Sequence, residues 1–157
     1  MMDEEADVAE SNQRATQRRV AVLCVVVASV TVAYWLAWFA HRSLVASSTS
    51  ATYDGFEQAF PLADGWLVVC LLAAGHTLWR GQRQAVLWLL MGGGAGIYLF
   101  GMDVLYDLEH GTWTSGTNGL VELGINLATI GISAPLVWWT WTHRRALDPP
   151  GHPSDQH

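Results

Sequence analysis

The chain has 157 residues, of which 51% are hydrophobic and only 14% are charged. Because the apolar residues gather in four long runs, this composition is typical of a membrane protein rather than of a soluble domain. The net charge of −6 owes much to five acidic residues among the first ten, and all eight basic residues are arginines. No basic stripe suited to nucleic acid is present, so we expect no nucleic-acid partner.

Residues 1–19 are acidic and then arginine-containing, and we expect them to form a polar cytoplasmic tail that is either flexible or a frayed helix. The first apolar run, residues 20–40, contains no charged side chain. A retained transmembrane helix suits this length better than a cleaved signal peptide, whose apolar region is about 7–15 residues long. A loop rich in serine and threonine follows this first span.

Three further spans are predicted at residues 61–79, 85–107 and 120–141. The connection between the second and third spans is very short, so these two helices must be antiparallel neighbours. Pro135 is expected to kink the fourth span, and residues 144–157 are expected to form a second cytoplasmic tail. The sequence therefore predicts an all-α fold, a polytopic integral membrane four-helix bundle with one transmembrane domain, residues 20–143.

The arginines predict the orientation of this bundle. Four crossings place residues 1–19, 80–84 and 142–157 on one side of the membrane, and seven of the eight arginines fall in these segments. By the positive-inside rule, both termini are cytoplasmic and the protein is a multi-pass protein of the cell membrane. Tryptophans gather near both ends of the predicted spans, as in the aromatic belts of membrane proteins.

The third span combines close packing with acidity. Gly92 and Gly96 form a G-x-x-x-G step, which lets a neighbouring helix approach closely and also offers a surface for a homo-oligomer. Asp103 and Asp107 lie one turn apart on the same stripe of the helix. Cys24 and Cys70 fall at different depths of the first two spans, so we expect two buried free thiols rather than a disulfide.

A polar stripe is predicted on the fourth span, where four polar residues recur at spacings of 4, 3 and 4: Glu122, Asn126, Thr129 and Ser133. Such a stripe is poorly placed against lipid, so it should face the bundle interior or a wet cavity. We therefore expect a pocket that opens to the outer side, with Asp103 and Glu122 as its floor and Asn126 deeper. The other expected ligand-binding residues are Glu57, Asp64, Asp107, Tyr34 and Trp38.

Such a pocket would bind or relay a cation, a proton or a small amphiphile. One alternative is a membrane-embedded enzyme of the isomerase or cyclase type, with Asp103 or Glu122 as catalytic general acid on a lipid-soluble substrate. The second alternative is a structural scaffold without a ligand, in which the polar stripes only join helices. The expected partners are membrane lipids together with a lipid-soluble small molecule or a cation.

No metal site and no cofactor is predicted. Asp103, Asp107 and His110 share one helical face and are the best candidates for metal ligands, but the pattern lacks a second histidine. No C-x-x-C redox motif, phosphate-binding glycine loop or serine nucleophile elbow is present.

Overall fold

The computed structural model describes residues 2–41, 60–114 and 116–147 of the chain. The elements, in order, are α1 (Met2–Ala40), α3 (Phe60–Trp79), α4 (Gln84–His110), the short 3-10 helix η2 (Thr112–Thr114) and α5 (Thr117–His143). All four long helices contain a segment long and apolar enough to cross a membrane. The protein is therefore an all-α four-helix bundle and a small multi-pass membrane protein.

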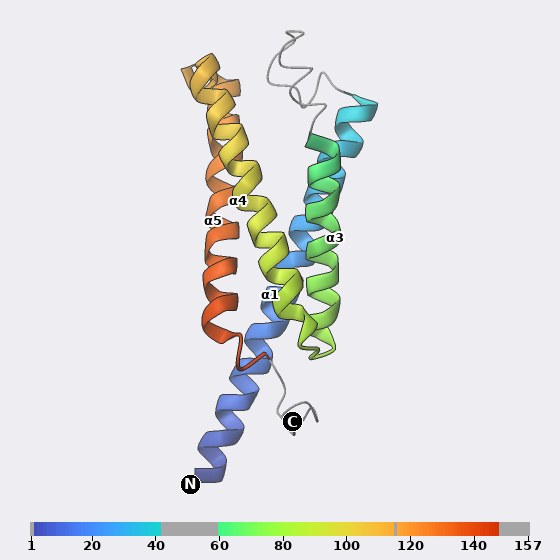
Figure 1. The fold of residues 1–157 in the computed structure, drawn as a ribbon, viewed down its shortest axis with the longest axis vertical. Helices are drawn as coiled ribbons and strands as arrows, with labels where there is room; N and C mark the ends of the chain where they lie inside the picture. The colour runs from blue at the N-terminus through green and yellow to red at the C-terminus, as the bar shows by residue number, and fades with distance from the viewer. Residues whose placement is uncertain (1, 42–59, 115, 148–157) are drawn as a thin grey trace, which may run out of the picture.

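The helices follow one another as antiparallel neighbours: α1 packs on α3, α3 on α4, and α4 on α5. The backbones of α1 and α5 do not come into contact within the described residues. One end of the bundle carries the turn between α3 and α4, the end of α5 and the first turns of α1 (Figure 1). We call it the terminal end. The opposite end, here the distal end, carries the end of α1, the start of α3 and the connection from α4 to α5.

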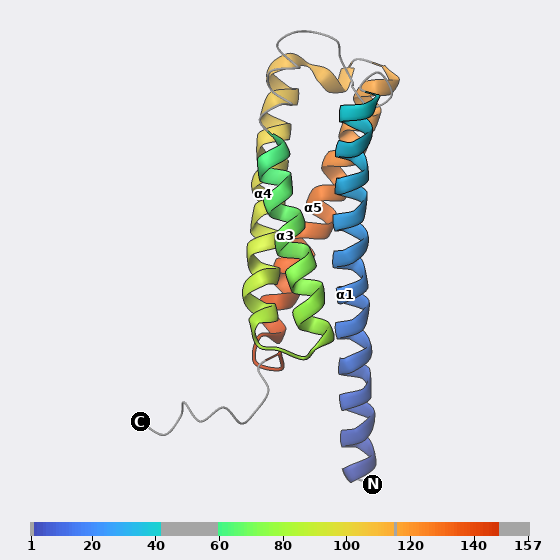
Figure 2. The ribbon, with the colours of Figure 1, turned by 90° about the vertical axis from the view of Figure 1, so that its right-hand side faces the viewer.

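A helix covers each of the four predicted spans. The helices α3, α4 and α5 begin and end within three residues of the spans predicted for them. The helix α1 continues through the polar residues 2–19, and its first turns project beyond the terminal end of the other helices (Figure 2). At the distal end, α4 stops at Gly111, whose φ of 64° is left-handed and whose N–H bonds to the carbonyl of Asp107, as in a glycine C-cap.

Glycines set the close approach of neighbouring helices. A Cβ atom on Gly75 of α3 would lie 3.3 Å from the carbonyl oxygen of Ala21 in α1. A Cβ on Gly92 would lie 3.3 Å from Leu71 of α3, whereas one on Gly96 would clash with Ser133 of α5. The predicted close approach is confirmed, and the two glycines of the G-x-x-x-G step serve different neighbours. Gly92 is thus covered by α3 within this chain.

The buried core has two parts. The aliphatic core in the terminal half is built from small and aliphatic side chains: Ala21, Cys24, Ala28, Leu71, Ala74, Leu78, Ala85, Leu89, Leu136 and Leu147. The aromatic core in the distal half contains Trp35, Trp38, Phe60 and Leu99, with Tyr34, Ala63, Leu67 and Tyr106 packed against it. Cys24 and Cys70 are both buried and free, as the sequence predicts.

Candidate functional site

A buried polar contact joins α4 and α5 near the distal end. The side-chain amide of Asn126 donates a hydrogen bond of 2.8 Å to Oδ2 of Asp107. Asp107 is only 5% exposed and Asn126 only 1% exposed. The short connection fixes this register, because Gly119 at the start of α5 packs directly on the backbone of η2 at Thr112. A side chain at Gly119 would separate the two elements.

Near the distal end, two buried polar atoms have no hydrogen-bond partner among the described residues: Oδ1 of Asn126 in α5 and Nε1 of Trp113 in η2. An unsatisfied buried polar group costs about 1–3 kcal/mol. An amide has one donor end and one acceptor end, and Asp107 satisfies only one of them, whichever way the amide is turned. The other end of Asn126 therefore offers an unused contact to a ligand or a water molecule.

Asp107 has no basic partner among the described residues. Among the described residues, its carboxyl group bonds to the neutral amide of Asn126, and the described arginines all belong to the terminal end. His110 follows one turn later, but its Nδ1 lies 2.9 Å from the carbonyl of Tyr106 and its ring stacks on Tyr106 at 4.1 Å. A carboxyl group buried without a basic partner is uncommon in a bundle interior, because its charged form is costly to bury unpaired.

The sequence predicts that Asp103 and Glu122 together form the floor of a pocket, whereas the contact that the structure shows between α4 and α5 joins Asp107 to Asn126. Asp103 is half-buried one turn from Asp107 toward the middle of the bundle. Glu122 is half-buried one turn from Asn126 in the opposite direction. With 1.5 Å of rise per residue, the two acids lie on the order of 10 Å apart along the helix axes. The buried pair between them is Asp107 and Asn126.

The remaining members of the predicted polar stripe on α5 have a packing role. Ser133 is buried and packs against Gly96. Thr129 is half-buried, and its hydroxyl group donates to the carbonyl of Ile125 in its own helix. The prediction that the stripe faces the interior is confirmed for Asn126 and Ser133.

A second polar contact lies on the other side of the bundle, where Nε1 of Trp35 in α1 donates a 2.8 Å hydrogen bond to Oδ2 of Asp64 in α3. Tyr34 and Trp38, which the sequence predicts to bind a ligand, lie in or against the aromatic core that also contains Trp35. The ring of Trp35 lies 5.3 Å from that of Tyr34 and 5.9 Å from that of Trp38. Asp64 thus has a structural partner on another helix, which no local pattern in the sequence indicates.

Glu57 lies outside the described residues. Within the described ranges, no three His, Cys, Asp or Glu side chains form a group that could hold a metal ion. Of the three residues on this face of α4, Asp103 is half-buried and His110 is exposed. Asp107 is buried and bonds to the amide of Asn126.

Comparison with known proteins returns no match among protein-family models, curated proteins or solved structures.

Proposed function

We propose that this membrane protein binds or relays a proton or another small cation at the Asp107–Asn126 pair. The observation that carries the proposal is the buried carboxylate of Asp107, which bonds to a neutral amide and to no basic described residue. The unsatisfied Oδ1 of Asn126 provides a second oxygen beside it. Carboxylate and amide oxygens are the usual protein ligands of hard cations.

The proposal includes an orientation. Arg14, Arg18 and Arg19 are exposed near the terminal end, as are Arg80 and Arg83 in the turn between α3 and α4. The positive-inside rule then places the terminal end, with residues 1–19 and 144–157, in the cytoplasm. The Asp107–Asn126 pair would accordingly lie toward the outer surface. Labelling of single cysteines in intact cells tests this, since a cysteine at exposed Glu109 should react with an impermeant maleimide and one at exposed Gln82 should not.

The test of function compares Asp107→Asn with Glu109→Gln, which removes an exposed carboxyl group from the same turn of α4. The full chain is reconstituted in liposomes with an internal pH dye, and proton uptake is followed after an acid pulse. Sodium and potassium are tested on the same vesicles with dyes for these ions. For whichever of these ions the wild-type protein takes up, we expect Asp107→Asn to lower uptake or binding by at least about ten-fold, a loss of about 1.4 kcal/mol. Glu109→Gln should leave the uptake or binding of that ion unchanged.

Asn126→Leu keeps a side chain of similar size while removing the amide, so it should reduce the same signal. Circular dichroism and thermal unfolding in detergent show whether each variant is folded. Equal activity of folded Asp107→Asn and wild-type protein would contradict the proposal. In that case the polar contact only joins α4 to α5, as expected of a scaffold.

A membrane-embedded enzyme is the second candidate, and one observation favours it. Asp64 is a carboxyl group beside a cluster of aromatic rings, with Trp35 donating to it. A carboxylic acid among aromatic side chains suits general-acid chemistry on a lipid-soluble substrate. Mass spectrometry of small molecules that copurify with the protein discriminates the two candidates, because only the enzyme needs an apolar substrate that is lost on Asp64→Asn.

A further inference from the structure

The partner of Asp107 is an amide, a neutral group that can either donate or accept a hydrogen bond. Nδ2 of Asn126 donates to Oδ2 of Asp107 at 2.8 Å, which suits a charged carboxylate, because a carboxylate only accepts. At the other end of the amide, Oδ1 is buried without a partner among the described residues. A half-turn about the Cβ–Cγ bond exchanges the two ends and leaves the backbone in place. Asn126 can therefore serve both the charged and the protonated form of Asp107.

Protonation of Asp107 changes which end of the amide is needed. A protonated carboxyl group carries an O–H donor, which needs an acceptor. After the half-turn, Oδ1 of Asn126 lies where Nδ2 lay and accepts this bond. The contact between α4 and α5 thus keeps one hydrogen bond in either form of Asp107, and no further side chain is required.

A metal cation finds a poorer match at this pair. Hard cations such as calcium and magnesium take six or more oxygen ligands, whereas Asp107 and Asn126 supply two carboxylate oxygens and one amide oxygen. Nδ2 of Asn126 lies 2.8 Å from Oδ2 of Asp107, and an N–H group repels a cation. Among the described residues, no group of three His, Cys, Asp or Glu side chains could hold a metal ion. A proton needs only one acceptor atom, so it fits the pair better.

The titratable groups around the pair offer little positive charge to Asp107. Near the distal end, the described helices that build or adjoin the site carry Asp103, Glu109 and His110 in α4, Glu122 in α5 and Asp64 in α3. The element η2 has no titratable side chain, and α1 packs on α3 but not on α4 or α5. His110 is exposed. The described arginines belong to the terminal end, so none of them competes with a proton for this carboxylate.

We propose that the cation bound at Asp107 is a proton, and that Asn126 is the positioning residue whose amide turns to accept it. This inference rests on the proposed function, because it names the ion for the same site. A proton from water forms an O–H bond at Oδ2 of Asp107, the bond donated by Nδ2 breaks, and the new O–H group donates to Oδ1 of Asn126. On release, the O–H bond breaks, the proton returns to water, and Nδ2 donates to Asp107 again.

The experiment is infrared difference spectroscopy of the full chain in liposomes, between neutral and acidic pH. Wild-type protein should gain the C=O band of protonated Asp107 and show a shift of the amide C=O band of Asn126, which heavy-carbon labelling of asparagine identifies. Asp107→Asn should remove both signals, while the bands of other carboxyl groups remain. Asn126→Leu should move the carboxyl band, because the O–H group has lost its acceptor, whereas Asn126→Gln, which keeps an amide, should retain an amide shift.

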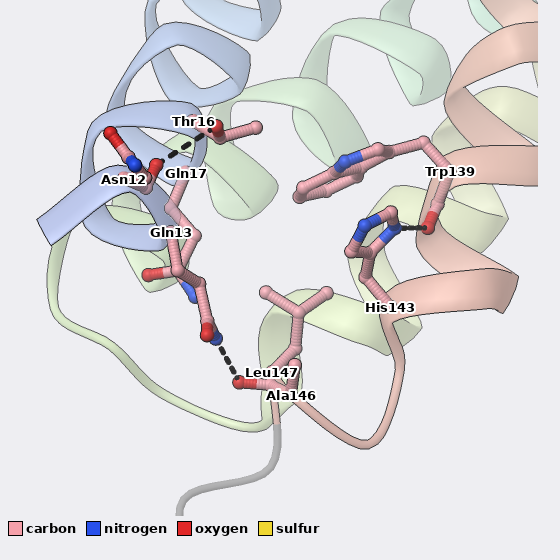
Figure 3. Close-up of a pocket in the computed structure, with 8 residues that line it drawn as sticks. All are labelled: Asn12, Gln13, Thr16, Gln17, Trp139, His143, Ala146 and Leu147. Carbon is pink, nitrogen blue, oxygen red and sulfur yellow. Dashed lines mark hydrogen bonds between the residues drawn. The ribbon is translucent and has the colours of Figure 1, made fainter. Parts of the chain in front are cut away.

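The matched control breaks a hydrogen bond from an amide at the opposite end of the bundle. Figure 3 shows a cavity of about 230 Å³ there, where Nε2 of Gln13 in α1 donates a 2.8 Å hydrogen bond to the carbonyl of Ala146 after α5. This amide also joins two distant parts of the chain, but none of the residues that line the cavity carries a carboxyl group. Gln13→Leu should therefore leave both infrared signals as they are in wild-type protein, even if it lowers stability.

Replacement of the other ions separates this inference from the proposed function. Proton uptake by wild-type protein should be unchanged when choline replaces sodium and potassium. Uptake of sodium or potassium that depends on Asp107, without the carboxyl band, would overturn the inference and leave the proposed function standing. The absence of any ion signal that depends on Asp107 would overturn both. A carboxyl band at the same position in wild-type protein and in folded Asn126→Leu would show that Asn126 does not accept the proton, and would also overturn the inference.

Discussion

In the terminal half of the bundle, the buried hydroxyl groups of Thr77 and Thr140 donate to carbonyl groups of their own helices. In the distal half, Asp107 and Asn126 bond across α4 and α5, and Asp64 accepts a bond from Trp35 across α1 and α3. A threonine that bonds within its own helix is satisfied before the helices meet. A carboxyl group is not, so its partner must come from another helix.

This difference indicates that function should be sought in the distal half of the bundle. The terminal half is joined by small residues and aliphatic contacts, and its buried polarity does not depend on its neighbours. The distal half retains carboxyl groups whose burial is costly, together with an amide oxygen that no described residue satisfies. Costly polarity inside a membrane protein is the feature that most often accompanies binding or transport.

The largest effect is expected from a substitution that disturbs the packing between α4 and α5. Gly96→Leu places a side chain against Ser133, where even a Cβ atom would clash. Over-packing of a tight interface typically costs about 1–3 kcal/mol, and this site should lie at the upper end. Unfolding in mixed micelles, followed by tryptophan fluorescence, measures the loss.

Gly94→Leu is the matched control, because a Cβ atom there meets nothing within 4 Å. It adds the same side chain to the same helix on an exposed face, so stability should not fall. If both variants lose the same stability, the glycine at position 96 matters for the helix backbone rather than for its contact with α5.

A smaller effect is expected from the cross-helix contact of the aromatic core. Trp35→Phe keeps an aromatic ring but removes the indole N–H that Asp64 accepts. The free energy of unfolding should fall by about 1–2 kcal/mol, because the carboxyl group is left without its donor. Trp66→Phe in α3, where the side chain is 46% exposed, should change stability by less than about 0.5 kcal/mol.

The aromatic core can also be tested by combining Trp35→Phe with Asp64→Asn. If the hydrogen bond carries the effect, the double variant should lose less stability than the sum of the two single variants. Strict additivity would show that Trp35 stabilises the bundle only through packing.

Much of the fold was predictable from the sequence, because each span has a local cause. Apolar runs of membrane length predict the helices, and the short connection after Trp79 makes α3 and α4 neighbours. The site was only partly predictable. Asp107 and Asn126 were both named, but the sequence paired Asp103 with Glu122, because spacing on one helix reports a face and not the register between two helices.

That register depends on contacts that have no local signature. Gly119 packs on η2, and this contact sets how far α5 is displaced along α4. Likewise, nothing in the first span distinguishes Trp35 from its apolar neighbours. Its role required the position of Asp64 on another helix.

The smallest effect should come from the terminal half. Thr77→Val preserves the shape of the side chain and removes a hydroxyl group that bonds to Ala73 at 2.7 Å and Ala74 at 3.1 Å in the same helix. Since those carbonyls also accept bonds within the helix, the expected change in unfolding free energy is less than about 0.5 kcal/mol. Hydrogen bonds across transmembrane helices average only about 0.6 kcal/mol, so the difference between the two variants is small. The unfolding free energies of Thr77→Val and Trp35→Phe must therefore be measured in the same detergent. A loss for Thr77→Val as large as that for Trp35→Phe would mean that α3 depends on polar bonds along its whole length, and the contrast between the two halves would not hold.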